Sequence, residues 1–112
     1  MSLDITIKQV HTVLCPHCGQ PVKTEVVDEV PGGGRDWYPF LESIGYYVPY
    51  VPYEKRTPEN DWYGKDMTIA TEQALALVEY IKKHPFIYGA EAKNLVAMAL
   101  LDGDAIVINA DW

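Results

Sequence analysis

Alternating apolar and polar side chains predict two strands in the first thirty residues. Over residues 3–14 the apolar positions recur at every second residue, which is the period of a strand with one buried face. The positions change parity once, and this change predicts a β-bulge near residues 8–10. A return strand is predicted over residues 22–30, with three valines on one face: Val22, Val26 and Val30. A two-stranded hairpin is marginally stable in water, so we expect it to pack on the rest of the chain.

Apolar residues at helical spacing predict two helices in the C-terminal half. The first covers about residues 69–83, with Thr68 as its N-cap and Pro85 beyond its end. The second covers about residues 90–101. A nearly all-apolar run at residues 105–109 then predicts a strand that is covered on both faces. We expect this strand to join the hairpin in one small sheet, with the two helices on one face.

The middle of the chain predicts little regular structure. The sequence PGGG at residues 31–34 is interpreted as a flexible linker, because no Lys-Ser or Lys-Thr pair follows to make it a phosphate-binding loop. Asp36 is predicted to cap a short helix over residues 37–44. Residues 54–66 are interpreted as a polar loop. The prediction is therefore one α+β domain over residues 1–112, made of a hairpin (1–30), a loop-rich segment (31–66) and a helical part with a final strand (67–112).

An aromatic and proline-rich repeat, YYVPYVPY, covers residues 46–53. Its Y-V-P period of three matches the three residues per turn of a polyproline II helix, so three tyrosines would form one ridge: Tyr47, Tyr50 and Tyr53. One interpretation is an aromatic ridge that binds a protein partner or a second copy of the chain, since tyrosine is common at interfaces. The other is a segment that lies over the protein's own core.

Both cysteines of the chain lie in one short turn, CPHCG, at residues 15–19. The turn and its flanking strands resemble the knuckle of zinc-ribbon proteins over about residues 12–26. This resemblance implies that Cys15 and Cys18 bind Zn²⁺. Zinc usually takes four ligands, and a ribbon has a second cysteine pair that this chain lacks. His84 could complete the site through the fold, or a second chain could supply another pair of cysteines. The alternative is a hairpin tip without metal.

The order Cys-Pro-His-Cys also resembles the active-site motif of thioredoxin-fold thiol oxidases. That activity requires Cys15 at the N-terminus of a helix, where the helix dipole lowers the pKa of the thiol. The residues after the motif are Gly-Gln-Pro and a run rich in valine, which predict a strand instead. The sequence therefore disfavours redox chemistry at this turn.

Composition narrows the function further. The chain has 112 residues and a net charge of −7, so it lacks the basic face that phosphate contacts with nucleic acid require. It shows no apolar run of roughly 20 residues and no signal peptide, and its two cysteines fit a reducing cytoplasm. No sequence pattern brings together His84, Asp102 and Asp104 as a catalytic group. We expect a small, acidic, non-enzymatic interaction or accessory protein, with a homodimer as its assembly.

Overall fold

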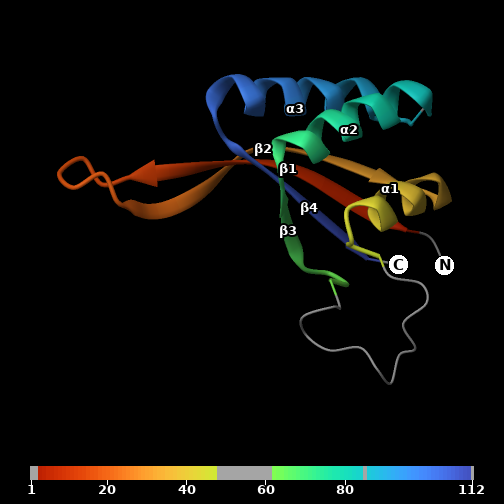
Figure 1. Ribbon diagram of the computed structural model, residues 1–112, viewed down its shortest axis with the longest axis horizontal. Coiled ribbons are helices and arrows are strands. Elements are labelled where there is room, and N and C mark those ends of the chain that lie inside the picture. Colours follow the sequence, from red (N-terminus) through yellow and green to blue (C-terminus); the bar gives the residue numbers. More distant parts are fainter. Residues whose placement is uncertain (1–2, 48–61, 85, 112) are drawn as a thin grey trace.

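A computed structural model describes residues 3–47, 62–84 and 86–111 of the protein. In these residues four strands, three α-helices and one 3-10 turn follow along the chain: β1 (Asp4–Leu14), β2 (Pro21–Gly33), η1 (Arg35–Trp37), α1 (Tyr38–Ser43), β3 (Asp66–Ile69), α2 (Thr71–Lys83), α3 (Gly89–Asp102) and β4 (Ala105–Asp111). The strands form one antiparallel sheet in the order β2-β1-β4-β3 (Figure 1). The predicted α+β class is confirmed.

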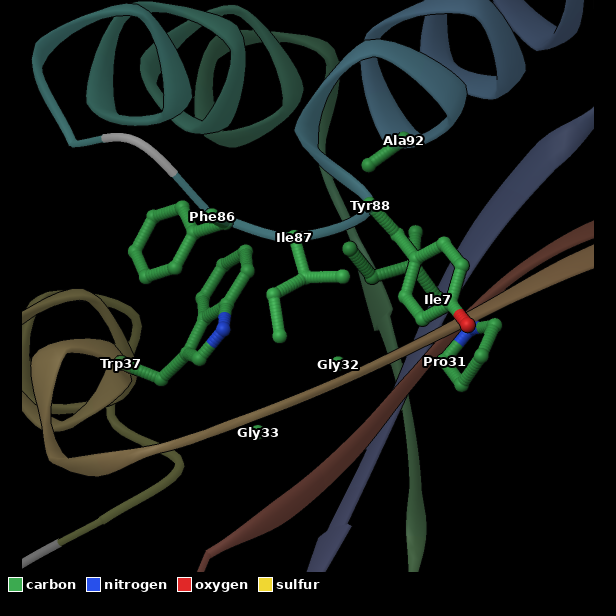
Figure 2. A pocket seen from close by; sticks show the side chains of 9 residues that line it. All are labelled: Ile7, Pro31, Gly32, Gly33, Trp37, Phe86, Ile87, Tyr88 and Ala92. Carbon is green, nitrogen blue, oxygen red and sulfur yellow. The ribbon is translucent and has the colours of Figure 1, made fainter.

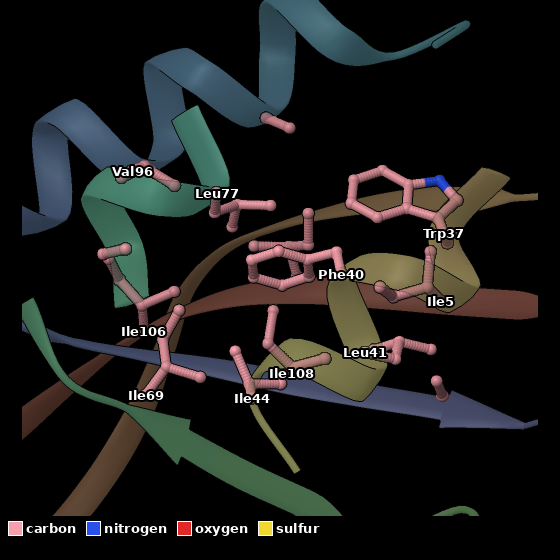
Figure 3. Packing of buried hydrophobic residues seen from close by; sticks show 14 of the residues in the cluster. Ile5, Trp37, Phe40, Leu41, Ile44, Ile69, Leu77, Val96, Ile106 and Ile108 are labelled. Carbon is pink, nitrogen blue, oxygen red and sulfur yellow. The ribbon is translucent and has the colours of Figure 1, made fainter. Parts of the chain in front are cut away.

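The core lies between the sheet and its helices, with α2 and α3 side by side over one face (Figures 1 and 3). Alternate residues of β1 and β4 point into it, while α1 contributes Phe40 and Leu41. Leu77 of α2 and Val96 of α3 reach the same cluster, and both side chains are fully buried. Burying an aliphatic side chain of this size stabilises the fold by about 1.5–3 kcal/mol. The predicted cover of two helices on one face is confirmed.

β4 lies between β1 and β3 in the sheet and is the strand that the apolar run at residues 105–109 predicts. Three successive residues of β4 are buried: Ile106, Val107 and Ile108. Ile108 pairs with Ile7 of β1 and with Met67 of β3, so the C-terminal strand holds both neighbours together.

The short strand β3 was not predicted. Thr68, expected to cap the following helix, lies inside β3 and pairs with Val107. The helix begins at Thr71, and its cap is formed by Gln73, whose side-chain oxygen accepts a hydrogen bond from the backbone N–H of Ala70 at 2.8 Å. Four residues are too few to show a two-residue period, and β3 forms because the edge of β4 needs a partner.

A bulge interrupts the pairing of β1 and β2 beside Gln9 and Val10, but the extra residue lies in β2, and β1 keeps its regular alternation. Gln9 pairs with Asp28 and Val10 with Val26, so the extra residue is Val27 in the return strand. The bulge reverses which side chains of β2 face the helices, because the side-chain period is two. The expectation of a common face for the three valines is therefore wrong, since only Val30 is buried.

The glycines after Val30 are not a linker, because β2 continues through Gly33. Gly33 pairs with Asp4, and a Cβ there would lie 2.8 Å from the carbonyl oxygen of Leu3. Only glycine permits so close an approach of two strands. Asp36 does not cap α1, since neither the 3-10 turn nor the helix has a side-chain cap.

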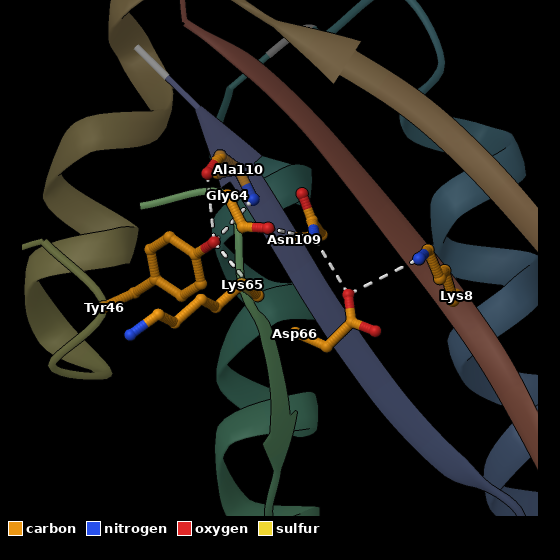
Figure 4. A network of polar contacts seen from close by, with 7 residues as sticks. All are labelled: Lys8, Tyr46, Gly64, Lys65, Asp66, Asn109 and Ala110. Atoms are coloured by element: carbon orange, nitrogen blue, oxygen red, sulfur yellow. Dashed lines mark hydrogen bonds and ion pairs between the residues drawn. The ribbon is translucent and has the colours of Figure 1, made fainter. Parts of the chain in front are cut away.

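A polar network joins the end of the sheet to the segment after α1 (Figure 4). The buried hydroxyl of Tyr46 lies 2.7 Å from the backbone nitrogen of Ala110, which donates to it, and 2.7 Å from the carbonyl oxygen of Lys65. Nearby, the side-chain amide of Asn109 donates to Asp66 at 2.8 Å. This hydrogen bond, aided by Lys8, lowers the pKa of Asp66. The contacts fix the start of β3 and the end of β4 beside α1.

Candidate functional site

Beyond the end of β4, strands β1 and β2 continue alone as a projecting hairpin, which we call the hairpin arm (residues 11–28). Pairing of β1 with β4 stops at Val10, whereas pairing with β2 continues to Leu14. The arm extends away from the helices along the 48 Å long axis of the molecule (Figure 1). Its side chains are exposed except for the half-buried Val13 and Cys15. Neither face of the arm is covered by another described element.

The hairpin arm exposes apolar side chains and a free strand edge. More than half of each of four aliphatic side chains is accessible: Leu14, Val22, Val26 and Val27. β2 is an edge strand, and within the described residues no strand pairs with its outer side. An uncovered edge with apolar side chains is a template for pairing with another chain. Within the described residues, the arm therefore combines an exposed apolar surface with an unpaired strand edge.

The turn at the tip of the hairpin arm directs backbone N–H groups at a thiol. Its ends are joined by a hydrogen bond from the N–H of Cys15 to the carbonyl of Gln20, at 2.8 Å, and Gly19 has the positive φ of 73° that the turn requires. Hydrogen bonds from the backbone of His17 and then of Cys18 lower the pKa of the Cys15 thiol, with the Cys18 side chain adding to the effect. The thiolate is the form that binds metal, so these hydrogen bonds favour Cys15 as a metal ligand.

Cys15 and Cys18 have no third metal ligand beside them in the described part of the chain. Among residues 3–47, 62–84 and 86–111, no cluster of three or more histidine, cysteine or acidic side chains could hold a metal ion. His84 follows the end of α2, which lies at the opposite end of the long axis from the arm tip (Figure 1). Its ring stacks on Tyr80, with centroids 4.2 Å apart. His84 is thus not placed to share a metal with the two cysteines.

The surroundings of Cys15 differ from those of a thiol oxidase. The turn leads directly into β2, which begins at Pro21, so Cys15 does not lie at a helix N-terminus. The predicted strand after the motif is confirmed. The backbone of a hairpin turn, and not a helix dipole, lowers the pKa of this thiol.

The aromatic ridge falls mostly outside the described residues, since Tyr50 and Tyr53 lie in the segment 48–61. Tyr47 packs its ring against Tyr38, with centroids 4.8 Å apart and planes inclined at 57°, and it is partly buried against the core. The ring of Tyr47 therefore contacts the chain's own body.

A polar cluster at the base of the hairpin arm was not anticipated. His11 Nδ1 lies 2.7 Å from a carboxylate oxygen of Asp104, whose other oxygen accepts a hydrogen bond from the buried Gln9 at 2.8 Å. The contact with Asp104 raises the pKa of His11, and the contact with His11 lowers that of Asp104. Asp102 also approaches Gln9, at 3.4 Å. The cluster ties the arm to the turn before β4, and its members are 93 and 95 residues apart in sequence, so no local pattern could reveal it.

No protein-family model matches this chain, and searches of curated proteins and of solved structures find no match. No helix in the described part of the chain is long and apolar enough to cross a membrane.

Proposed function

We propose that this chain is a non-enzymatic protein-interaction module that forms a homodimer through the outer edge of β2 in the hairpin arm. The observation that carries the proposal is the arm itself, a two-stranded hairpin that projects from the body with its apolar side chains in solvent. Such a hairpin is marginal in water by itself, and an added strand would both cover its side chains and satisfy its edge.

The sequence of the arm suits a second copy of itself. The run Val22-Lys23-Thr24-Glu25-Val26 places valine at both ends and opposite charges on either side of its central threonine. Two antiparallel copies centred on Thr24 would place each Val22 opposite Val26 of the partner subunit. Each Lys23 would then face Glu25 of the partner subunit. Apolar and opposite-charge pairs across strands each contribute about 0.2–1 kcal/mol.

The arrangement is isologous, because the same contacts occur twice about a twofold axis. Its apolar pairs would cover the side chains of Val22 and Val26, which are 64% and 55% exposed in the single chain. Bulges at Val22 and Val27 limit regular pairing to the short run between them. An interface of this length is similar in size to small, reversible protein–protein interfaces. We therefore expect the dimer to have a dissociation constant on the order of micromolar or weaker.

Charge reversal tests the pairing, with sedimentation velocity over a range of protein concentrations as the measurement. The wild type should show a concentration-dependent dimer. Lys23→Glu would place two glutamates opposite each other, and Glu25→Lys would place two lysines opposite each other, so each variant should be monomeric. Mixed in equal amounts, the two variants should regain the dimer, because every facing pair then joins a glutamate to a lysine. Lys83→Glu, an exposed change of the same charge on α2, is the matched control.

Two outcomes would contradict the proposal. One is a wild type that stays monomeric at the highest concentration reached. The other is a dimer that both reversals leave unchanged, since the dimer would then use another surface. Circular dichroism of each variant confirms that the sheet has formed.

A second candidate function is structural zinc binding at the arm tip, with two chains supplying four thiolates. The backbone hydrogen bonds that lower the pKa of Cys15 support it. The two candidates require different dimers. In the pairing centred on Thr24, residue 20 of one chain lies opposite residue 28 of the other. At about 3.3 Å per residue the two tips, which lie beyond residue 20, are therefore more than about 25 Å apart. One such dimer cannot share a metal between its tips.

Native mass spectrometry before and after chelator separates the two candidates. A dimer that carries one zinc ion, dissociates on chelation and is lost in Cys15→Ser would establish the shared thiolate site and contradict the strand-edge dimer. A metal-free dimer that is insensitive to chelator but lost in Glu25→Lys supports the strand-edge pairing and removes the zinc site.

A further inference from the structure

A pocket of about 250 Å³ lies between the sheet and the connection from α2 to α3 (Figure 2). Ile7 and the β2 backbone at Gly32 form its floor, and Trp37 forms one wall. Ile87 and Tyr88, from the connection, lie over it. The residues that line it are uncharged and mostly apolar, so the pocket suits an uncharged molecule.

Beside the pocket, β2 carries glycine where a strand residue would point toward the helices. Gly32 pairs with Ile5, on the covered face of the sheet. A Cβ at this position would lie 3.0 Å from the side chain of Ile5 and 3.4 Å from Nε1 of Trp37. The missing side chain therefore lets Ile5 and the polar edge of the indole pack directly against the strand.

The indole N–H of Trp37 is a buried donor without an acceptor. Trp37 is 2% exposed, and its Nε1 is the one buried side-chain polar atom in the described part of the chain that has no hydrogen-bond partner. Phe86 stacks on the indole with centroids 4.1 Å apart and planes inclined at 19°, which fixes the direction of the N–H. Figure 2 shows the nitrogen on the edge of the ring that faces Ile87 and Gly32. An unpaired buried donor is costly, and a bound acceptor would remove that cost.

Two side chains with exposed surface border the pocket. Ile87 lies beside the indole edge in Figure 2 and is 92% exposed, so it can move without breaking core contacts. On the other side, the ring of Tyr88 lies beside Pro31 and is half exposed. These two side chains form the mouth of the pocket.

We propose that this pocket binds a small, flat, uncharged aromatic molecule whose carbonyl or ring-nitrogen acceptor receives the Nε1–H of Trp37. The size follows from the volume. A cavity of about 150 Å³ holds benzene, so 250 Å³ accommodates a fused bicyclic molecule. The acceptor follows from the unpaired donor. The site is separate from the hairpin arm and does not depend on the proposed dimer.

Two probes of matched shape test the proposal. The bicyclic ketone 1-indanone carries an acceptor, and indane is the same bicycle without it. Both are titrated into ¹⁵N-labelled protein, and the indole N–H signal of Trp37 is assigned by its loss in Trp37→Phe. We expect 1-indanone to shift this signal and to bind roughly three- to tenfold more tightly than indane, the range for one hydrogen bond. In Trp37→Phe the two probes should bind equally.

A pair of leucine substitutions on α3 locates the binding. Ala92→Leu fills the pocket from α3 and should abolish binding of both probes, whereas Ala97→Leu, on the exposed side of the same helix, should leave it unchanged. If a variant fails to fold, the comparison of 1-indanone with indane on the wild-type protein still tests the proposal. Equal affinity for 1-indanone and indane, or no shift of the Trp37 signal with either, would overturn the proposal.

Discussion

Replacing Tyr46 by phenylalanine should destabilise the fold by about 3 kcal/mol. The hydroxyl is buried and accepts the N–H of Ala110 at 2.7 Å, while its proton is within reach of the carbonyl of Lys65, also at 2.7 Å. Each lost hydrogen bond costs about 0.5–1.5 kcal/mol, and a buried N–H left without a partner costs about 1–3 kcal/mol. The ring itself stays, so no large cavity adds to the loss.

The measurement is urea unfolding followed by circular dichroism. The variant should unfold at lower urea with an unchanged slope, which indicates a loss of stability without a change in the surface exposed on unfolding. Tyr88→Phe is the matched control, because Tyr88 is half exposed and its hydroxyl has no hydrogen-bond partner among the described residues. It should change the free energy of unfolding by less than about 0.5 kcal/mol. A loss in Tyr46→Phe as small as that of the control would refute the role assigned to the hydroxyl.

The stability difference between wild type and Tyr46→Phe should also depend on pH. Burial raises the pKa of Tyr46 above its ordinary value of 10.0. A group with a raised pKa in the folded state contributes stability that is present below the unfolded pKa and is lost as the pH rises through the folded value. The stability difference between wild type and Tyr46→Phe should therefore shrink at strongly alkaline pH. Comparing the two proteins cancels the similar contributions of Tyr38 and Tyr80, whose pKa values burial also raises.

Three further outcomes are expected. The hydrogen bond to Asp104 raises the pKa of His11 above 6.5 in the folded protein. The stabilisation from this hydrogen bond is therefore present below pH 6.5 and is lost as the pH rises through the pKa of His11 in the folded state. Thermal melts should show this decline in the wild type and not in His11→Asn. Leu77→Ala should cost about 3 kcal/mol in urea unfolding, while Leu75→Ala, half exposed on the same helix, should cost far less. Gly103→Ala should cost about 1 kcal/mol, because Gly103 ends α3 with φ at 70°.

Periodic segments of the sequence were sufficient to predict most of the fold. The helical stripe of α2 and the apolar run of β4 are strong local signals, and each appears in the structure. The change of parity in the first strand indicated an irregularity near residues 8–10, although the extra residue lies in β2. β3 was missed because four residues carry too little pattern. The prediction of a linker at Gly32 and Gly33 is wrong because these glycines accommodate neighbours that only the fold brings close.

Of the candidate sites, one could be found in the sequence and the other forms only in the folded protein. The CPHCG turn could be found in the sequence, because its chemistry lies within five adjacent residues. The pocket beside Trp37 could not, since Gly32, Trp37 and Phe86 come from three separate segments that meet only after the helices pack on the sheet. His84, offered as one source of a further metal ligand, follows the end of α2, at the far end of the molecule from the cysteines.

The amino-acid sequence by itself determined the class of fold, the hairpin with its cysteine turn and the acidic character of the chain, because each of these is set by neighbouring residues or by composition. The tertiary structure alone decided which valines face solvent, which strand edge is free and where a donor is buried without an acceptor. These properties depend on register, and a single extra residue at Val27 is enough to reverse the faces of a strand.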